Sequence, residues 1–367
     1  MVKRELYLNQ IRPFIDKPFI KVITGIRRSG KSQILMMLRD ELKERGVKEE
    51  QILYINFESY EYADIEDDKQ LYQFVRQRII PNAKTYIMLD EIQVVQRWEK
   101  VVNSFMVDFD CDVYITGSNS KLLSSELATF IAGRYIELTV YPLSFAETFD
   151  FYKAMGSVER DKKEAFNRFA RIGGFPALYI ADFSEADALK IVGDISSSAI
   201  LKDIVARHKI RNVALLEKIM QYVFDNIGNT FSAKKISDYF KSEKRTVDIE
   251  TIYNYLSYLE DAFIIHRVPR YDVRGKEILK TNEKFYLGDH ALKYAVLGYN
   301  ETAVSGVLEN IVFLELKRRG YKVNIGKLDD KEIDFVAEKN GAKVYIQVAF
   351  RDVYKRQVIQ PHPIRGR

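Results

Sequence analysis

The chain has 367 residues, of which 47% are hydrophobic and 30% are charged, and its formal net charge is +5. These values fit a globular protein of two or three domains, and the small positive charge allows nucleic-acid binding without arguing strongly for it. Cys111 is the only cysteine, which excludes a disulfide framework and a cysteine-based zinc site.

No apolar run approaches the roughly 20 residues that a membrane-spanning helix needs, and the first residues lead into no apolar signal-peptide core. We therefore expect a cytoplasmic protein that does not associate with a membrane. Residues 352–357 resemble a translated sequencing adapter, and residues 358–367 show no apolar period. We expect 352–367 to be a non-native tail, and the alternative is a genuine disordered tail.

Short apolar runs alternate with helical patterns over the first 141 residues. This alternation predicts an α/β fold with a parallel sheet and helices on both faces. The predicted strands lie at 19–24, 52–57, 85–90, 112–116 and 134–138, and the predicted helices at 31–45, 69–80, 98–107 and 121–131.

The pattern changes after residue 141. Residues 142–210 are mostly helical in pattern and form a predicted lid or linker, interrupted at Gly173–Pro176. Residues 211–283 show three helical patterns followed by two apolar runs, the order of a winged helix. Residues 284–351 combine a helix near 304–319 with three short strands, which predicts a small α/β unit.

Residues 25–32 match the pattern G-x-x-x-x-G-K-[ST] between a predicted strand and a predicted helix. Glycines in such a loop allow the backbone to approach phosphate, and consecutive N–H groups face the anion. The pattern predicts ATP binding, with Lys31 at the β- and γ-phosphates and the Ser32 hydroxyl on Mg²⁺. The predicted nucleotide-binding residues are Gly25, Ile26, Arg27, Arg28, Ser29, Gly30, Lys31, Ser32 and Gln33.

An apolar strand that ends in two carboxylates follows two units later, at Tyr86–Glu91. This arrangement is typical of the second half of a nucleotide-hydrolysing site. We expect Asp90 to hold Mg²⁺ through water, and Glu91 to orient and deprotonate the attacking water.

Two further residues are candidates for catalysis. Asn119 follows the fourth predicted strand and would lie between the γ-phosphate and the attacking water, with Ser118 as the alternative and an ordinary Gly-Ser turn as the structural interpretation. Arg134 would reach the nucleotide of a neighbouring subunit as an arginine finger, which requires a homo-oligomer. The alternative for Arg134 is a surface ion pair.

Together these motifs resemble a large group of predicted bacterial and archaeal AAA-type ATPases. The resemblance also rests on Pro142–Phe145, Gly173–Pro176, Leu259–Phe263 and Glu332–Phe335, and it extends to Arg351. It implies ATPase activity, association with nucleic acid, and a C-terminal region of unassigned function with a winged helix and a restriction-endonuclease-like fold.

The winged helix would bind DNA through its third helix at 247–261. Ile249, Ile252, Leu256 and Leu259 fit a buried face, but Asp248 and Glu250 on the opposite side would repel phosphate. We therefore expect phosphate contacts rather than base readout, and a protein-binding module is the alternative. The nucleic-acid candidates are Lys234, Lys235, Lys244, Arg245, Arg267, Arg270, Arg274 and Lys276.

The resemblance to a restriction-endonuclease core implies a metal centre of carboxylates with a lysine. The matching positions are Glu309, Asp334, Gln347 and Ala349. Because Gln347 is a neutral ligand and Ala349 replaces the lysine, we expect a degenerate centre without nuclease activity.

Three functional hypotheses follow. The first is an ATP-driven switch that couples hydrolysis to duplex DNA or to a protein partner. The second is a nucleotide-dependent scaffold with little turnover. The third, which we rank last, is an ATP-gated nuclease.

Overall fold

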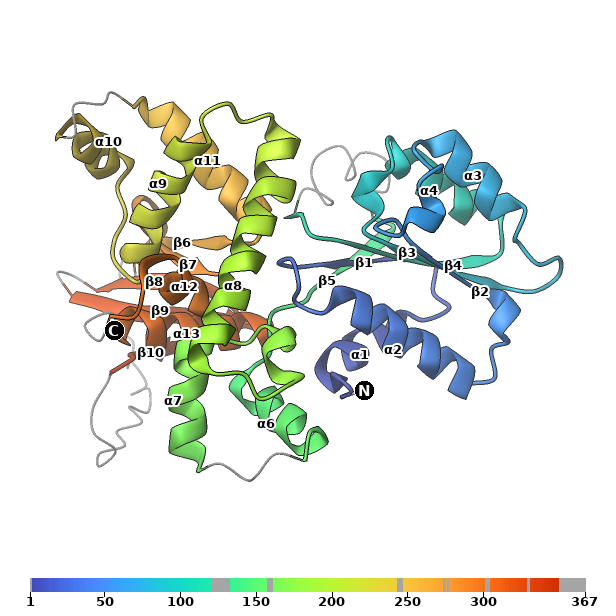
Figure 1. The fold of residues 1–367 in the computed structure, drawn as a ribbon, viewed down its shortest axis with the longest axis horizontal. Helices are drawn as coiled ribbons and strands as arrows, with labels where there is room; N and C mark the ends of the chain where they lie inside the picture. Colours follow the sequence, from blue (N-terminus) through green and yellow to red (C-terminus); the bar gives the residue numbers. More distant parts are fainter. Residues whose placement is uncertain are drawn as a thin grey trace, which may run out of the picture.

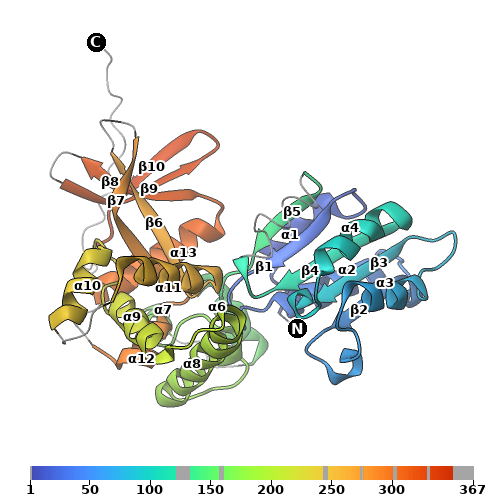
Figure 2. The ribbon, with the colours of Figure 1, turned by 90° about the horizontal axis from the view of Figure 1, so that it is seen from above.

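The computed structural model describes residues 2–120, 133–156, 161–242, 247–272, 275, 277–300, 304–328 and 331–349, with only the backbone at 277–282. These residues form two lobes, an N-terminal one and a C-terminal one (Figures 1 and 2). The predicted helix at 121–131 and the predicted tail at 352–367 lie outside the described residues.

The N-terminal lobe contains a five-stranded parallel sheet in the order β2-β3-β4-β1-β5, which confirms the predicted α/β class. Two helices cover each face, α1 and α2 on one side and α3 and α4 on the other (Figure 1). The elements are β1 (Ile20–Thr24), β2 (Ile52–Asn56), β3 (Thr85–Asp90), β4 (Cys111–Gly117), β5 (Tyr135–Thr139), α1 (Glu5–Ile11), α2 (Lys31–Glu44), α3 (Asp68–Arg76) and α4 (Trp98–Asp108).

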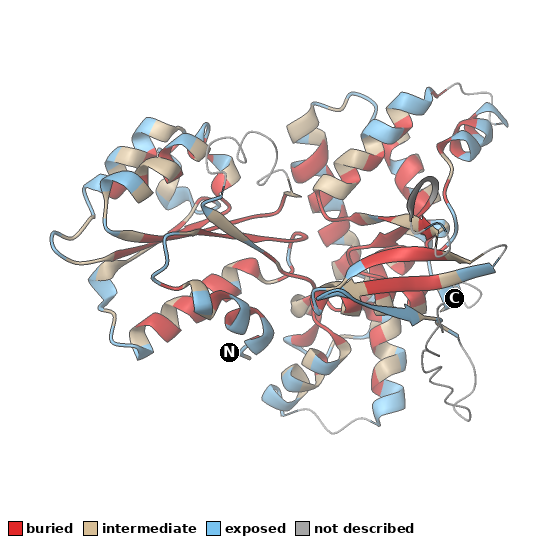
Figure 3. Cartoon of the chain, turned by 180° about the vertical axis from the view of Figure 1, so that it is seen from behind, coloured by how far each residue is buried: buried red, intermediate tan, exposed pale blue. Residues whose placement is uncertain are grey.

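The central strands are buried along their length, as the continuous apolar runs predict (Figure 3). Strand β1 also contains one charged residue, Lys21. Its ammonium group is fully buried and pairs with Asp112 of β4. The hydroxyl of Tyr114 donates to Asp112 Oδ2 at 2.8 Å. A buried lysine is tolerated because its charge is both paired and hydrogen-bonded.

The C-terminal lobe begins with helices that pack on one another and ends with a second sheet. The elements are α6 (Phe145–Ala154), α7 (Lys162–Ile172), α8 (Glu185–Ala199), α9 (Val213–Asp225), α10 (Ala233–Ser242), α11 (Ile249–Asp261), β6 (Ile265–Asp272), β7 (Glu277–Leu287), α12 (Ala291–Leu297), α13 (Val304–Arg318), β8 (Lys322–Leu328), β9 (Lys331–Lys339) and β10 (Ala342–Ile346). A π-helical segment, Ile200–Ala206, continues α8.

The second sheet joins two units that the sequence separates. Its order is β10-β9-β8-β6-β7, so the hairpin β6–β7 shares a sheet with β8, β9 and β10. The expected boundary at residue 283 therefore falls inside β7. Three helices, α9, α10 and α11, and the hairpin β6–β7 do appear in the order expected of a winged helix. The division into domains stays a prediction.

Three details differ from the predicted elements. Helix α3 ends at Arg76 rather than at residue 80. Helix α12 has no counterpart in the prediction. Ile249, which fits the buried face of α11 by spacing, is 43% exposed because it lies in the first turn of the helix.

None of the helices in the described ranges has the length and apolar character that a membrane span requires.

Gly173 and Gly174 form a junction between the lid and the C-terminal sheet. The Gly174 N–H donates to Asp289 Oδ2 at 2.8 Å, and the Gly174 carbonyl accepts from the Leu143 N–H at 2.6 Å. A Cβ on Gly174 would lie 2.2 Å from the Leu143 carbonyl oxygen. Only glycine fits this close approach of two backbones.

We predict that Gly174→Ala lowers the free energy of unfolding by roughly 3 kcal/mol or more, because two backbone segments would have to separate. The matched control is Gly193→Ala on α8, where a Cβ would meet nothing within 4 Å. The control should be neutral or stabilising by up to about 1 kcal/mol, since alanine favours helix. Thermal or urea unfolding of both variants tests this, and equal stabilities would contradict it.

Candidate nucleotide site

The phosphate loop joins β1 to α2 at the carboxyl edge of the parallel sheet. Gly25 has φ +142° and Gly30 has φ +100°, values that L side chains rarely adopt. A Cβ on Gly25 would lie 2.2 Å from the Val140 carbonyl oxygen. The two glycines therefore allow the tight turn that directs the start of α2 toward the loop.

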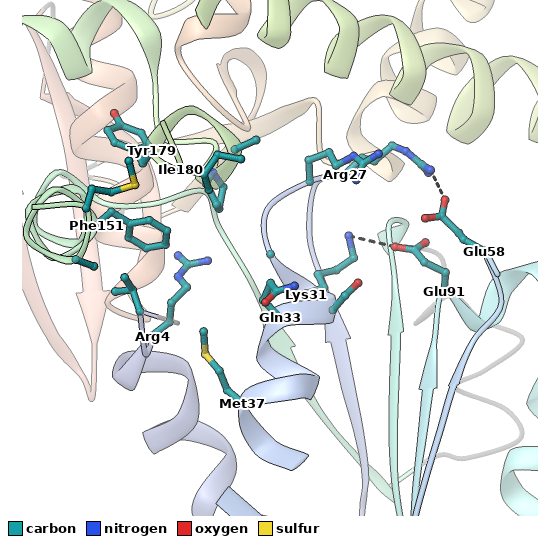
Figure 4. A pocket seen from close by; sticks show the side chains of 18 residues that line it. Arg4, Arg27, Lys31, Gln33, Met37, Glu58, Glu91, Phe151, Tyr179 and Ile180 are labelled. Atoms are coloured by element: carbon teal, nitrogen blue, oxygen red, sulfur yellow. Dashed lines mark hydrogen bonds and ion pairs between the residues drawn. The ribbon is translucent and has the colours of Figure 1, made fainter. Parts of the chain in front are cut away.

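Lys31, the first residue of α2, projects back over the loop. Its ammonium group donates to the carbonyl oxygens of Gly25 at 3.1 Å and Ile26 at 3.3 Å, and it lies 3.6 Å from Glu91 Oε1 (Figure 4). Lys31 is buried, so its positive charge acts at close range on whatever occupies the loop.

Asp90 ends β3 as a fully buried carboxylate. It accepts hydrogen bonds from the hydroxyls of Thr116 and, at 3.0 Å, Tyr54. Burial raises the Asp90 pKa, and hydrogen bonds from Thr116 and Ser32 oppose that rise. Asp90 and Ser32 are thus neighbours, and their carboxylate and hydroxyl oxygens are hard ligands of the kind that Mg²⁺ prefers.

Glu91 has a left-handed backbone, with φ 56° and ψ 45°, which is uncommon for a non-glycine residue. The Thr116 hydroxyl, which also donates to Asp90, accepts from the Glu91 N–H at 3.0 Å. Burial alone would raise the Glu91 pKa, but the charge of Lys31 and a hydrogen bond from Gln93 hold it below its ordinary value. Thr116 therefore fixes both carboxylates, and Glu91 is ionised at neutral pH.

A cavity of about 560 Å³ opens beside the loop, between the two lobes. Its charged side carries Lys31, Glu91 and Arg27, and its other side is formed by apolar residues of the lid and α2 (Figure 4). The apolar side chains are Met37, Phe151, Met155, Pro176 and Ile180. The cavity thus offers a phosphate-binding end and an apolar end to one ligand.

The other predicted catalytic residues lie in different places. Ser118 and Asn119 follow β4 and are buried, and the Ser118 hydroxyl donates to Asp203 Oδ1 at 3.0 Å. Arg134 is exposed at the start of β5, and its carbonyl oxygen accepts from the Ile20 N–H. It therefore lies at the amino edge of the sheet, opposite its own phosphate loop. The role of each of these residues stays a prediction.

Several residues that contact the site belong to no sequence motif. Tyr54 reaches Asp90 from β2, because β2 pairs with β3 and sets Asn56 opposite Asp90. Arg4 donates to the Ser29 carbonyl at 2.9 Å and pairs with Glu147 of the lid at 2.8 Å. Only Thr116 had a local signal, since it belongs to the polar end of the fourth predicted strand.

The nucleic-acid candidates are only partly described. Lys234 and Lys235 are exposed on α10. Arg267 pairs with Glu260 at 2.9 Å and lies over the rings of Tyr253 and Phe285. Arg270 is half-buried, and Lys244, Arg245, Arg274 and Lys276 lie outside the described residues.

The positions predicted to form a degenerate nuclease centre lie beside a buried lysine that the sequence analysis did not name. Lys284 of β7 is 2% exposed and pairs with Glu309, at 3.5 Å, and with Glu332. The Tyr286 hydroxyl donates to Glu309 Oε2 at 2.9 Å. Burial raises the Glu309 pKa, the Lys284 charge opposes that rise, and the Asp334 charge adds to it.

The remaining positions of that centre do not complete a metal site. Asp334 Oδ2 accepts from the Val348 N–H at 2.6 Å, while Gln347 and Ala349 are exposed. Within the described ranges, no group of three or more His, Cys, Asp or Glu side chains is arranged to hold a metal ion. Lys284 pairs with Glu309 and with Glu332, and its single positive charge offsets one of these two negative charges.

Known families match both halves of the chain. An AAA domain family matches residues 17–149, and a domain of unknown function (DUF8612) matches residues 163–303. An uncharacterized protein of Haemophilus influenzae is 43% identical over 353 residues, which cover 95% of this chain and 87% of that protein. The uncharacterized protein MJ1544 of Methanocaldococcus jannaschii is 32% identical over 328 residues, covering 86% and 71%.

A solved structure has a similar fold. The Walker-type ATPase PABY2304 of Pyrococcus abyssi superposes with a TM-score of 0.56 at 15% identity, covering 81% of this chain and 96% of that one. The parallel sheet and its phosphate loop define the class of P-loop ATPase folds. Within that class, the chain belongs to the family of AAA-type ATPases in which a C-terminal domain of unknown function follows the AAA domain.

We predict that Lys284→Met lowers the free energy of unfolding by roughly 3 kcal/mol, because it leaves the buried Glu309 carboxylate without its cation. The double variant Lys284→Met/Glu309→Gln should recover part of that loss. Urea unfolding of both variants measures the effect. A single variant as stable as the wild type would show that Lys284 does not neutralise the cluster.

Proposed function

We propose that the chain binds ATP with Mg²⁺ in the cavity beside the phosphate loop and hydrolyses it. The AAA-type fold supports nucleotide binding and hydrolysis in general. The observation that carries the proposal is that Lys31, Ser32 and Glu91 line one end of a cavity whose other end is apolar, with the buried Asp90 next to Glu91 at the end of β3. The triphosphate would occupy the charged end, and the adenine would contact the apolar side chains.

Each residue has a role that follows from its surroundings. Loop N–H groups and Lys31 would bind the β- and γ-phosphates. Ser32 and Asp90 would hold Mg²⁺, which neutralises phosphate charge when bound. Thr116 and Tyr54 would keep the Asp90 carboxylate in one orientation, since both donate to it.

Glu91 would orient and deprotonate the attacking water. Its carboxylate is held ionised by Lys31, which lies 3.6 Å away. Phosphate binding would draw the Lys31 charge toward the nucleotide and weaken this effect. The Glu91 pKa would then rise toward the range of a more effective base, so the catalytic carboxylate would be activated by the substrate itself.

Hydrolysis would be coupled to the C-terminal lobe, because lid residues Phe151 and Ile180 line the same cavity as Lys31. The lobe would bind duplex DNA through phosphate contacts from Lys234, Lys235 and the hairpin. A protein partner is the alternative, because the charge of Arg267 is already paired with Glu260 within the chain and is less available to a phosphate. A homo-oligomer with Arg134 as its arginine finger and a cytoplasmic location remain predictions.

A nucleotide-dependent scaffold with little turnover is the second candidate. It is favoured by the position of Arg134 on the edge of the sheet opposite the loop, which leaves catalysis dependent on a neighbour. The ATP-gated nuclease ranks last, because Gln347 and Ala349 supply neither a third carboxylate nor the lysine, and Lys284 already pairs with Glu309.

We predict that Glu91→Gln lowers the ATPase kcat at least about 100-fold while ATP still binds, because the amide cannot accept the water's proton. Lys31→Ala should lose ATP binding as well, since it removes the phosphate-binding charge. Phosphate release and titration with a fluorescent ATP analogue separate the two effects. An undiminished rate in Lys31→Ala would exclude hydrolysis at this site, whereas wild-type binding without turnover would favour the scaffold.

Coupling to DNA makes a separate prediction. Duplex DNA should raise the ATPase rate of the wild type, and Lys234→Ala/Lys235→Ala should weaken that stimulation at low salt while leaving the rate without DNA unchanged. The rate is measured at several salt concentrations with and without DNA. A rate indifferent to DNA in every case would favour a protein partner for the C-terminal lobe.

A further inference from the structure

Asp203 links three parts of the molecule through one buried carboxylate. It lies on the π-helical segment after α8 and is 4% exposed. Its Oδ1 accepts from the Ser118 hydroxyl at 3.0 Å and pairs with Arg27 Nη1 at 3.5 Å. Ser118 follows β4, and Arg27 belongs to the phosphate loop. The C-terminal lobe thus contacts the two loops that surround the phosphate site.

Arg27 is divided between two acidic partners. One terminal nitrogen of its guanidinium pairs with Asp203. The other pairs with Glu58, which follows β2 (Figure 4). Arg27 is 7% exposed, and its charge contributes to lowering the Glu91 pKa. Arg27, Lys31 and Glu91 line the same cavity, and Glu91 lies 3.6 Å from the Lys31 ammonium group. The Arg27 guanidinium is therefore close to the place where a γ-phosphate would bind. Phosphate oxygens are strong competitors for such a bidentate donor.

The space around Asp203 allows an exchange of partners. A second cavity, of about 720 Å³, is lined by Arg27, Glu91, Asp203 and Arg207. Among the described residues, the second oxygen of Asp203 and one terminal nitrogen of Arg207 are buried without a hydrogen-bond partner. Burial raises the Asp203 pKa, and the charges of Arg27 and Arg207 oppose that rise. Arg207 is therefore a second cation available to Asp203.

The backbone at this point is unusual for a helix. Residues 200–206 are π-helical, and such segments are rare and are frequently found at functional sites. Here the segment directs Asp203 toward the N-terminal lobe. The chain then continues through residues 207–212 into α9 (Val213–Asp225), the first helix of the predicted winged helix, so Asp203 lies on the segment that leads into that unit.

We propose that Asp203 is a positioning residue that couples the γ-phosphate to the C-terminal lobe by exchanging Arg27 for Arg207. Asp203 holds Arg27 until a γ-phosphate takes the guanidinium, and the carboxylate then pairs with Arg207. Arg27 would stabilise the charge of the γ-phosphate from within the same chain. The inference rests on the proposed binding of ATP at Lys31.

The exchange makes ATP affinity, but not ADP affinity, depend on Asp203. Asp203→Asn keeps the shape of the side chain and removes its charge, so Arg27 is released without competition. The variant should bind a non-hydrolysable ATP analogue about fivefold or more tightly than the wild type, with unchanged ADP affinity. In an Arg27→Ala background the same substitution should have no effect, because the competing guanidinium is gone. Asp194→Asn, an exposed acid on α8, is the matched control and should behave as wild type.

Hydrogen exchange of the segment that joins Asp203 to α9 provides a second readout. The ATP analogue should change exchange there in the wild type and ADP should not, and Arg27→Ala should lose the difference even if Asp203→Asn does not fold. Unchanged ATP and ADP affinities in a folded Asp203→Asn, or identical exchange with both nucleotides in the wild type, would overturn the inference. Wild-type protein that bound neither nucleotide would instead overturn the proposed function, and this inference with it.

Discussion

The arrangement of the two lobes depends on the buried guanidinium of Arg4. The side chain is 3% exposed and donates to the Ser29 carbonyl of the phosphate loop, to the Tyr141 carbonyl and to the Glu147 carboxylate of the lid. A charge removed from water is tolerated only when its hydrogen-bonding groups are met. Because those partners come from separate segments, the requirement brings the loop, the end of β5 and the start of α6 together.

Arg318 extends the same cluster to the second sheet. This side chain of α13 is 7% exposed, donates to the Pro142 carbonyl at 2.9 Å, and lies near Glu147. Glu147 thus pairs with two arginines, Arg4 and Arg318. Burial alone would raise the Glu147 pKa, but the Arg4 pair holds it below its ordinary value. The unit that contains α13 and the second sheet is therefore fixed to the segment that connects the parallel sheet to the lid. Its fold has a structural use that does not require a metal centre.

This construction explains why one cavity has two chemical characters. The charged end comes from the carboxyl edge of the parallel sheet, where loops carry polar side chains, and the apolar end comes from helices that bury their hydrophobic faces against each other. A ligand that fills both ends contacts both lobes. Any change in the length or charge of the ligand therefore acts where the two lobes meet, and Asp203 contacts Arg27 and Ser118 at the same place.

The sequence by itself determined the features that depend on neighbouring residues. The phosphate loop, the carboxylates after β3 and the order of strands and helices follow from local spacing, because glycine conformation and apolar periodicity act over a few positions. Only the tertiary structure decided the rest. Lys284 reaches Glu309 because β7 continues into the second sheet, Asp203 reaches Arg27 across 176 positions, and Gly174 is needed because of Leu143. Such contacts join segments far apart in the chain, and no local pattern encodes which buried charge will meet which.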